Sequence, residues 1–276
     1  MFGPAGSRFR GLPIRSLIPN SLTVLALCAG LTSMRFALQG HFQTAVTLIL
    51  VAAVIDGLDG RMARLLKGTS RFGAELDSLS DFVCFGVAPA FLLYQWSLSD
   101  MGGLGWMAVV AYAVCCALRL ARFNTMVDDH SRPAWTAHFF TGVSSPAAAG
   151  LAMLFIILSF EAGDTLWRLA PLNALWLIFV AALMVSRLPS YSFKKLRIRR
   201  EAGLLILLGV ALTAGLLISF PWYTLFGFGV LYLLSLPLAY RSYIRHQERD
   251  RALPEEDAPP PQAPAVEDEA ATRHLH

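Results

Sequence analysis

Eight apolar stretches of near-bilayer length follow one another along this chain. They span residues 17–36, 44–66, 76–98, 104–123, 146–160, 169–185, 202–220 and 222–243. A helix that crosses a membrane needs about 20 mostly apolar residues. Charged residues make up only 15% of the chain, against roughly 25% in an average soluble domain. We therefore expect an all-α fold, a polytopic membrane bundle of about eight transmembrane helices, and we exclude a soluble or coiled-coil protein.

The basic residues are divided unevenly between the two ends of these helices. If the N-terminus is inside, 21 of the 23 Lys and Arg residues fall in inner segments, and only Arg35 and Arg168 fall outside. Because cytoplasmic loops carry an excess of basic residues, both termini are predicted to be cytoplasmic in a multi-pass protein of the cell (inner) membrane. The same placement accounts for the net charge of +4 through contacts with membrane phospholipid, so no nucleic-acid partner is expected.

The chain divides into four segments by composition. Residues 1–16 alternate arginines with apolar residues, which fits either a cytoplasmic interfacial segment or a mobile leader. Residues 17–200 hold the first six predicted helices and form the membrane core, and 201–245 add two C-terminal transmembrane helices. Residues 246–276 are acidic and rich in proline, a composition that predicts a disordered tail.

Four aspartates lie where the second and third predicted helices end and begin. Asp56 and Asp59 are three residues apart, and Asp77 and Asp81 are four apart, so each pair shares one helix face. The short connection makes the two helices antiparallel neighbours, which predicts a cup of four carboxylates. Such groups are costly inside a membrane, about 2.5 to 3.5 kcal/mol each at a helix centre. A divalent cation between them would compensate that cost.

The oxygen ligands of this cup select a hard ion, so Mg²⁺ or Mn²⁺ fits, and two ions would match four carboxylates. The alternative is a set of plain ion pairs between the aspartates and nearby basic residues. These are Arg61, Arg64, Lys67 and Arg71. Small residues between the aspartates, Gly60, Ala63 and Gly73, would let a bulky ligand or a neighbouring backbone approach. Arg64, one turn after Gly60, could neutralise a phosphate.

These residues together resemble the signature of the CDP-alcohol phosphatidyltransferase family. Asp56, Asp59, Gly60, Ala63, Arg64, Gly73, Asp77 and Asp81 match D-x2-D-G-x2-A-R-x8-G-x3-D-x3-D at all its fixed positions. The resemblance implies a membrane enzyme that transfers a phosphatidyl or similar group from a CDP-linked lipid to an alcohol and releases CMP. It also implies that the four aspartates hold two divalent cations and that Asp81 is the general base. Gly60, Ala63, Arg64 and Gly73 would line the CDP site, and the enzyme would be a homodimer.

Further segments are similar to one branch of that family, the membrane-integral bacterial and archaeal phosphatidylserine synthases. They are IPNSLT at 18–23, ELDSLSDFVCFGVAPA at 75–90, ALRLARFN at 117–124, FFTGVSSPAAA at 139–149 and MVSRLPSYSFKK at 184–195. The likeness implies CDP-diacylglycerol and L-serine as substrates, with phosphatidylserine and CMP as products. Cys84 departs from the pattern, because a polar residue is usual there.

A serine acceptor requires a group that binds its carboxylate. Arg119 and Arg122 share a face near the cytoplasmic end of the fourth predicted helix, and with Asn124 they are candidates for binding serine or phosphate. Headgroup contacts would explain the two arginines equally well. Asn20 and Thr23, three apart on the first helix, are candidates for contacts to the CDP-lipid, and the alternatives are helix capping or polar contacts between helices.

Two other functions remain open from the residues alone. The acceptor could be glycerol 3-phosphate, inositol phosphate or choline, since the motif does not specify the alcohol. Intramembrane carboxylates also form cation pathways, so a divalent-cation transporter is the alternative from another class. Transport sites lie near the membrane midplane, whereas these aspartates gather at one helix end, which favours the transferase over a transporter or a structural scaffold.

Overall fold

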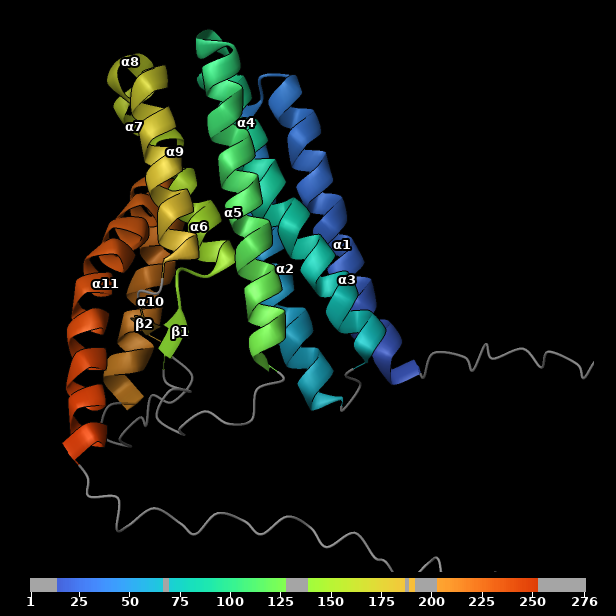
Figure 1. Ribbon diagram of the computed structural model, residues 1–276. Helices are drawn as coiled ribbons and strands as arrows, with labels where there is room; N and C mark the ends of the chain where they lie inside the picture. Colours follow the sequence, from blue (N-terminus) through green and yellow to red (C-terminus); the bar gives the residue numbers. More distant parts are fainter. Residues whose placement is uncertain (1–13, 67–69, 128–138, 187–188, 192–202, 253–276) are drawn as a thin grey trace, which may run out of the picture.

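The computed structural model describes residues 14–66, 70–127, 139–186, 189–191 and 203–252, and these residues form a bundle of helices that run up and down (Figure 1). The predicted all-α membrane bundle is confirmed. Six helical segments are long and apolar enough to cross a membrane, and shorter apolar helices occupy Ala170–Val185 and Leu207–Ser219. The number of crossings and the side on which the termini lie stay predictions. Of the predicted end segments 1–16 and 246–276, only residues 14–16 and 246–252 are described.

The N-terminal half of the bundle is a sequence of packed helices. Its elements are α1 (Ile14–Leu38), α2 (Phe42–Leu65), α3 (Arg71–Asp81), the π-helix η1 (Phe82–Val87), α4 (Ala88–Trp96), the 3-10 helix η2 (Leu98–Met101) and α5 (Gly103–Val127). The pair α1 and α2 packs most extensively, and α1 also contacts α3, η1 and α4. In Figure 1, α5 stands between this group and the C-terminal half.

The C-terminal half adds shorter helices and one small strand pair. Its elements are β1 (Phe139–Thr141), α6 (Ser145–Ala152), α7 (Leu154–Ala162), α8 (Asp164–Trp167), α9 (Ala170–Val185), β2 (Pro189–Tyr191), α10 (Gly203–Ser219) and α11 (Pro221–Ala252). The expected helix 146–160 is thus divided into α6 and α7. β1 and β2 pair antiparallel, with Phe139 opposite Tyr191, and α5 packs on α9 while α11 packs on α7.

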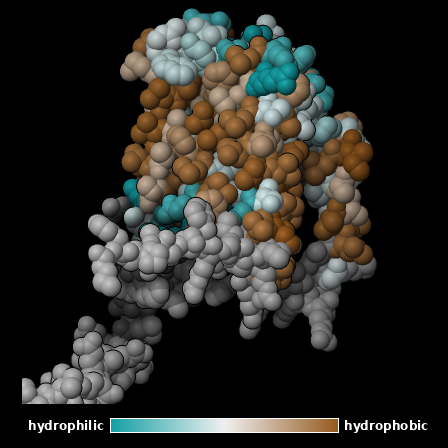
Figure 2. Space-filling model, turned by 90° about the vertical axis from the view of Figure 1, so that its right-hand side faces the viewer, coloured by the Kyte–Doolittle hydropathy of each residue, from teal (hydrophilic) through white to brown (hydrophobic). Residues whose placement is uncertain are grey.

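Apolar side chains cover the outside of the bundle, and the described interior combines large apolar and small side chains with a few buried polar ones. Leu175 and Ile218 are 73% and 84% exposed, whereas Ser33 and Asn173 are fully buried. Figure 2 shows one face on which hydrophobic residues form a broad band, with hydrophilic residues gathered at its upper end. This arrangement suits a hydrocarbon solvent, in which exposed apolar groups cost nothing and polar groups need partners within the protein.

The third span is one continuous rod from Arg71 to Trp96 that contains a π-helical turn. It begins five residues before the predicted start at Leu76, because Ser70 caps it by accepting a hydrogen bond from the Gly73 N–H at 3.0 Å. The π-turn begins directly after Asp81. A wider turn changes the angular register of the residues on either side of it, and such turns are frequent at functional sites.

The π-turn is held from the neighbouring helix α5. Tyr112, which is fully buried, donates a hydrogen bond from its hydroxyl to the carbonyl oxygen of Phe85 at 3.0 Å. On the other side, the Cys84 thiol donates to the carbonyl of Ala26 in α1 at 3.3 Å. The helix segment that follows Asp81 is therefore fixed from both α1 and α5.

Tyr112→Phe should lower the thermal unfolding midpoint of the detergent-solubilised protein by several degrees. The change removes the hydroxyl that satisfies a buried carbonyl, a loss of about 1 to 3 kcal/mol, and one kcal/mol corresponds to about 2 to 4 °C in a domain of 150–250 residues. Tyr94→Phe is the matched control, because the Tyr94 hydroxyl forms no hydrogen bond with the described part of the chain, while its ring contacts Trp106. Equal midpoints for the two variants would contradict this role.

Candidate functional site

The structure brings the four aspartates of the sequence motif together. One carboxylate oxygen each from Asp56 and Asp59 of α2 and from Asp77 of α3 lie within 4.8 Å of one another. Asp81, one turn further along α3, shares a side-chain hydrogen bond with Asp56. Two helix ends thus present all four carboxyl groups to one small volume.

The donor set at this volume fits a divalent cation. All of its ligand atoms are carboxylate oxygens, the type that Mg²⁺ and Mn²⁺ prefer. One oxygen of Asp81, Oδ1, is buried and finds no hydrogen-bond partner among the described residues, so it remains free to bind a cation. Like charges this close repel one another strongly unless a cation or protons compensate them.

The alternative of plain ion pairs is not what the described residues show. Arg61, Arg64 and Arg71 form no ion pair with the four aspartates there, and Lys67 lies outside the described residues. The cation that acts electrostatically on the cluster is Arg119 of α5, through Asp81. Among the described residues, ion pairs with the arginines of α2 and α3 therefore do not explain the cluster.

Asp59 has the least solvent-exposed side chain of the four aspartates and is oriented from α1. It is 4% exposed, and its Oδ2 accepts a hydrogen bond of 2.7 Å from the Thr23 hydroxyl. The carbonyl oxygen of Thr23 in turn accepts a bond of 3.3 Å from the hydroxyl of Ser80 in α3. Thr23 therefore links three helices and holds one carboxylate of the site, in the manner of the outer partners that orient metal ligands.

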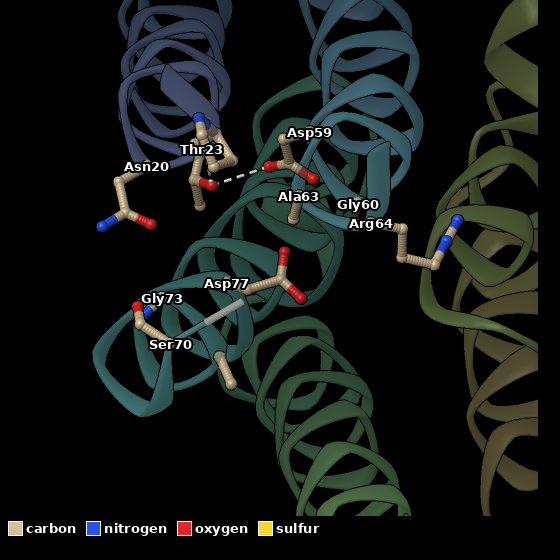
Figure 3. A pocket seen from close by; sticks show the side chains of 11 residues that line it. Asn20, Thr23, Asp59, Gly60, Ala63, Arg64, Ser70, Gly73 and Asp77 are labelled. Carbon is tan, nitrogen blue, oxygen red and sulfur yellow. Dashed lines mark hydrogen bonds between the residues drawn. The ribbon is translucent and has the colours of Figure 1, made fainter. Parts of the chain in front are cut away.

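A pocket of about 200 Å³ opens beside the aspartates, between α1, α2 and α3 (Figure 3). Its wall includes all six residues predicted to contact the CDP-lipid. These are Asn20, Thr23, Gly60, Ala63, Arg64 and Gly73. Asp59 and Asp77 also line it, so the pocket and the carboxylate cluster form one continuous site. In Figure 3, Arg64 extends away from Asn20 and Gly73.

The two glycines of the motif have different surroundings. A Cβ at Gly73 would lie 2.8 Å from Asn20 Oδ1 and 3.1 Å from Ser70 Oγ, so a larger residue there would displace the Asn20 side chain. A Cβ at Gly60 would meet nothing closer than Arg64 Nη1 at 4.0 Å. The Nδ2 of Asn20 is buried without a partner and is available to a ligand in the pocket.

The three predicted acceptor-binding residues separate into different surroundings. Arg119 donates from Nη1 to the hydroxyl of Ser145 at 2.5 Å and lies near Asp81. Arg122 donates from Nη1 to the Val185 carbonyl at the end of α9 at 2.9 Å. Asn124 donates from Nδ2 to the Ser78 hydroxyl at 3.0 Å. Of the three, Arg119 is the one whose charge acts on the carboxylate cluster.

Sequence reasoning did not identify Pro19, Ser70 and Ala74 of the pocket wall, nor Ser145 beside Arg119. Two of these carry a readable signal. Ser70 immediately precedes a helix, and Ser145 precedes a proline in the first turn of one, which are typical features of helix starts. That signal predicts a helix N-cap, however, and does not indicate which other helix the hydroxyl contacts.

The fold and site together define a multi-pass membrane protein with a carboxylate cluster beside a pocket between helices. The family model for CDP-alcohol phosphatidyltransferase matches residues 16–188, and the model for CDP-alcohol phosphatidyltransferase 2 matches residues 201–237. The chain belongs to the CDP-alcohol phosphatidyltransferase family, whose members are transferases that generally use divalent metals.

Relatives with a more specific name cover most of the chain. The CDP-diacylglycerol–serine O-phosphatidyltransferase of Mycobacterium leprae is 40% identical over 223 residues, 81% of this chain and 74% of the relative. The protein of the same name from Mycobacterium tuberculosis is 38% identical over 239 residues, which cover 87% of this chain and 82% of the relative. That from Helicobacter pylori is 34% identical over 200 residues, or 71% and 81% of the two chains.

Replacing one cluster carboxylate should weaken cation binding measurably. We expect Asp77→Asn to reduce the affinity of the detergent-solubilised protein for Mn²⁺ at least tenfold, because an amide supplies a neutral ligand where a charged one is removed. Titration calorimetry or the paramagnetic signal of free Mn²⁺ measures this without any substrate. Asp100→Asn, at an exposed position of η2, is the control. Unchanged Mn²⁺ affinity in Asp77→Asn would exclude this residue as a ligand.

Proposed function

We propose that this protein is a CDP-diacylglycerol–serine O-phosphatidyltransferase, which transfers the phosphatidyl group of CDP-diacylglycerol to the hydroxyl of L-serine. The relatives that carry this name support the choice of acceptor. The observation that carries the proposal is the pocket between α1, α2 and α3, in which the motif residues meet the aspartate cluster. A pocket next to gathered carboxylates suits a nucleotide whose pyrophosphate requires cations.

In the proposed site, the four aspartates hold two divalent cations, Mg²⁺ or Mn²⁺. When bound, the cations supply positive charge to the pyrophosphate oxygens and to the leaving phosphate. The hydroxyl of Thr23 holds the Asp59 carboxylate in position for this role through a hydrogen bond. Among the described residues, Oδ1 of Asp81 is buried and has no hydrogen-bond partner, and it is the atom proposed to accept the proton of the hydroxyl.

The pocket residues bind the CDP part of the donor. Asn20 offers its unpartnered Nδ2 to an acceptor atom of the ligand, and Thr23, Gly60, Ala63 and Gly73 provide a wall without bulky side chains. Arg64, at the edge of this wall, can neutralise a phosphate. On the far side of the aspartates, Arg119 is the main candidate for binding the acceptor alcohol.

In the net reaction, the serine hydroxyl oxygen forms a bond to the phosphorus of the phosphatidyl group. The bond from that phosphorus to the oxygen of CMP breaks, and CMP leaves with the electron pair. Asp81 takes the proton of the hydroxyl. Proton removal by a positioned carboxylate contributes about 10²- to 10⁴-fold to a rate, so this residue is proposed as both metal ligand and base.

The site is proposed to lie at the cytoplasmic face of the inner membrane. The support is the distribution of basic residues, of which 21 of 23 fall on the side of the aspartates when the N-terminus is inside. The division into a core of residues 17–200, two added helices at 201–245, an interfacial segment and a tail is proposed on the same sequence grounds. A homodimer is proposed from the family resemblance alone.

A divalent-cation transporter is a weaker proposal. In the described parts of the chain, one group of three or more potential ligand residues is found, and it lies at one end of the bundle beside a pocket. A transport pathway would need polar groups near the midplane with access from both faces. The described C-terminal helices contain no second acidic group of this kind.

Release of CMP by the purified protein tests the proposal. With CDP-diacylglycerol and Mn²⁺ or Mg²⁺, we expect CMP with L-serine and none with glycerol 3-phosphate, inositol phosphate or choline. Asp81→Asn should lower kcat at least a hundredfold because it removes the base, whereas Glu75→Gln, an exposed acid on the same helix, should leave kcat unchanged. CMP release with a different acceptor would refute the serine specificity, and release with none would favour transport.

The close approach at Gly73 generates a separate prediction. Gly73→Ala should raise KM for CDP-diacylglycerol about tenfold, equivalent to about 1.4 kcal/mol of binding, because the new methyl group displaces Asn20 from the pocket wall. KM for serine should change much less. Gly57→Ala is the control, since a Cβ there meets nothing within 4 Å. If Gly73→Ala leaves both KM values unchanged, the pocket is not the donor site.

A further inference from the structure

We propose that Ser145 is a positioning residue for Arg119 and thereby sets the affinity for the carboxylate of the acceptor. This inference rests on the proposed function, because it assigns the part of the site that recognises an amino acid rather than another alcohol. Ser145 opens α6, whereas Arg119 lies in α5, so the pair couples two helices that neither the motif nor the pocket includes.

The contact between the two side chains is direct and buried. Ser145 is 0% exposed, and its hydroxyl oxygen accepts the Nη1 donor of Arg119 at 2.5 Å. The thiol of Cys116, one turn before Arg119 on α5, lies 3.7 Å from the same oxygen. A guanidinium is planar, so one fixed donor determines the direction of the remaining ones.

The remaining donors of Arg119 are available for a ligand. Its Nε is buried and has no hydrogen-bond partner in the part of the chain that the structure describes, and the guanidinium is close enough to Asp81 to act on it electrostatically. A carboxylate bound by these donors would place the attached hydroxyl on the side of Asp81, where its proton is to be accepted. Arginine binds carboxylates strongly because two parallel N–H groups match the two oxygens.

The position of Ser145 is itself determined by α9. Gly142, three residues earlier, has φ +79°, and a Cβ there would lie 2.6 Å from the carbonyl oxygen of Met184. The Val143 N–H donates to the Leu183 carbonyl at 3.5 Å, and the backbone carbonyl of Ser144 then accepts the Ala148 N–H of the first turn of α6 at 2.8 Å. The turn before α6 therefore contacts the end of α9 so closely that the first residues of α6 have little freedom to move.

Among the described residues, Arg122 and Asn124 do not combine a buried unpartnered donor with an electrostatic effect on the aspartates, as Arg119 does. Arg122 uses Nη1 on the Val185 carbonyl, and Asn124 uses Nδ2 on the Ser78 hydroxyl. Both bonds join elements of the bundle to one another. Neither residue has a buried unpartnered donor among the described residues, and neither acts on the aspartate cluster. This contrast favours Arg119 as the group that faces the acceptor.

The test is steady-state kinetics of Ser145→Ala with both substrates varied. We expect KM for L-serine to rise about tenfold, while KM for CDP-diacylglycerol stays within twofold of the wild type. Ser145→Thr retains the hydroxyl and should restore most of the serine affinity. Ser144→Ala is the matched control, because the Ser144 side chain makes no capping hydrogen bond. Unchanged Mn²⁺ affinity in each variant shows that the folded site is intact.

A second measurement separates positioning from a general packing defect. In an Arg119→Lys background, Ser145→Ala should add little to the increase in serine KM, because the hydroxyl acts through the guanidinium. Additive effects, or equal increases in the two KM values, would overturn the positioning role. Absence of serine-dependent CMP release from the wild-type protein is a different result, which overturns the proposed function and the carboxylate assignment together. If Ser145→Ala leaves serine KM unchanged in an active protein, only the positioning role is overturned.

Discussion

Four carboxyl groups inside an apolar bundle impose the electrostatic constraint to which the rest of the site responds. Three of them present oxygens within 4.8 Å of one another, in surroundings where charges interact far more strongly than in water. Such a cluster is tolerated only where cations or protons compensate it and where the surrounding backbone is rigid. The contacts around the cluster supply that rigidity. Thr23 orients Asp59 from α1, and the cap at Ser70 fixes the start of the helix that carries Asp77.

The π-turn after Asp81 has a clear place in this arrangement. In a regular helix through residues 71–96, side chains before and after Asp81 would follow one continuous helical period. The wider π-turn rotates the residues after it relative to those before it. The faces of α3 and α4 can therefore satisfy different requirements. Gly73, Ala74 and Asp77, which precede the turn, line the pocket, whereas Cys84 and Phe85, within the turn, are buried against α1 and α5.

The two sides of the site are constructed from different parts of the chain. The pocket proposed for the donor lies between α1, α2 and α3, which are adjacent in sequence. The side proposed for the acceptor depends on α5 and α6, and α6 is positioned by the end of α9 through Gly142. The two proposed sides therefore meet at the aspartates but rest on different helices.

Much of the fold followed from the sequence alone. The apolar stretches predicted a helical membrane bundle, because stretches of that length have few other stable arrangements in lipid. The spacing of Asp56, Asp59, Asp77 and Asp81 predicted shared helix faces, because the helical period places residues three or four apart on one side. The π-turn, the division of the fifth predicted helix into α6 and α7, and the β1–β2 pair were not predicted. Each of these depends on contacts between helices and leaves no periodic signal.

The difference between what the sequence determines and what the tertiary structure decides is clearest at the hydroxyl groups of Thr23 and Ser145. The sequence determined which residues share a helix face, since that depends only on local geometry. The tertiary structure decided that Thr23 contacts Asp59, 36 residues away, and that Ser145 rather than a lipid headgroup receives Arg119. A short hydroxyl side chain has several possible partners within its own helix, so its actual partner is settled only when another helix packs against it.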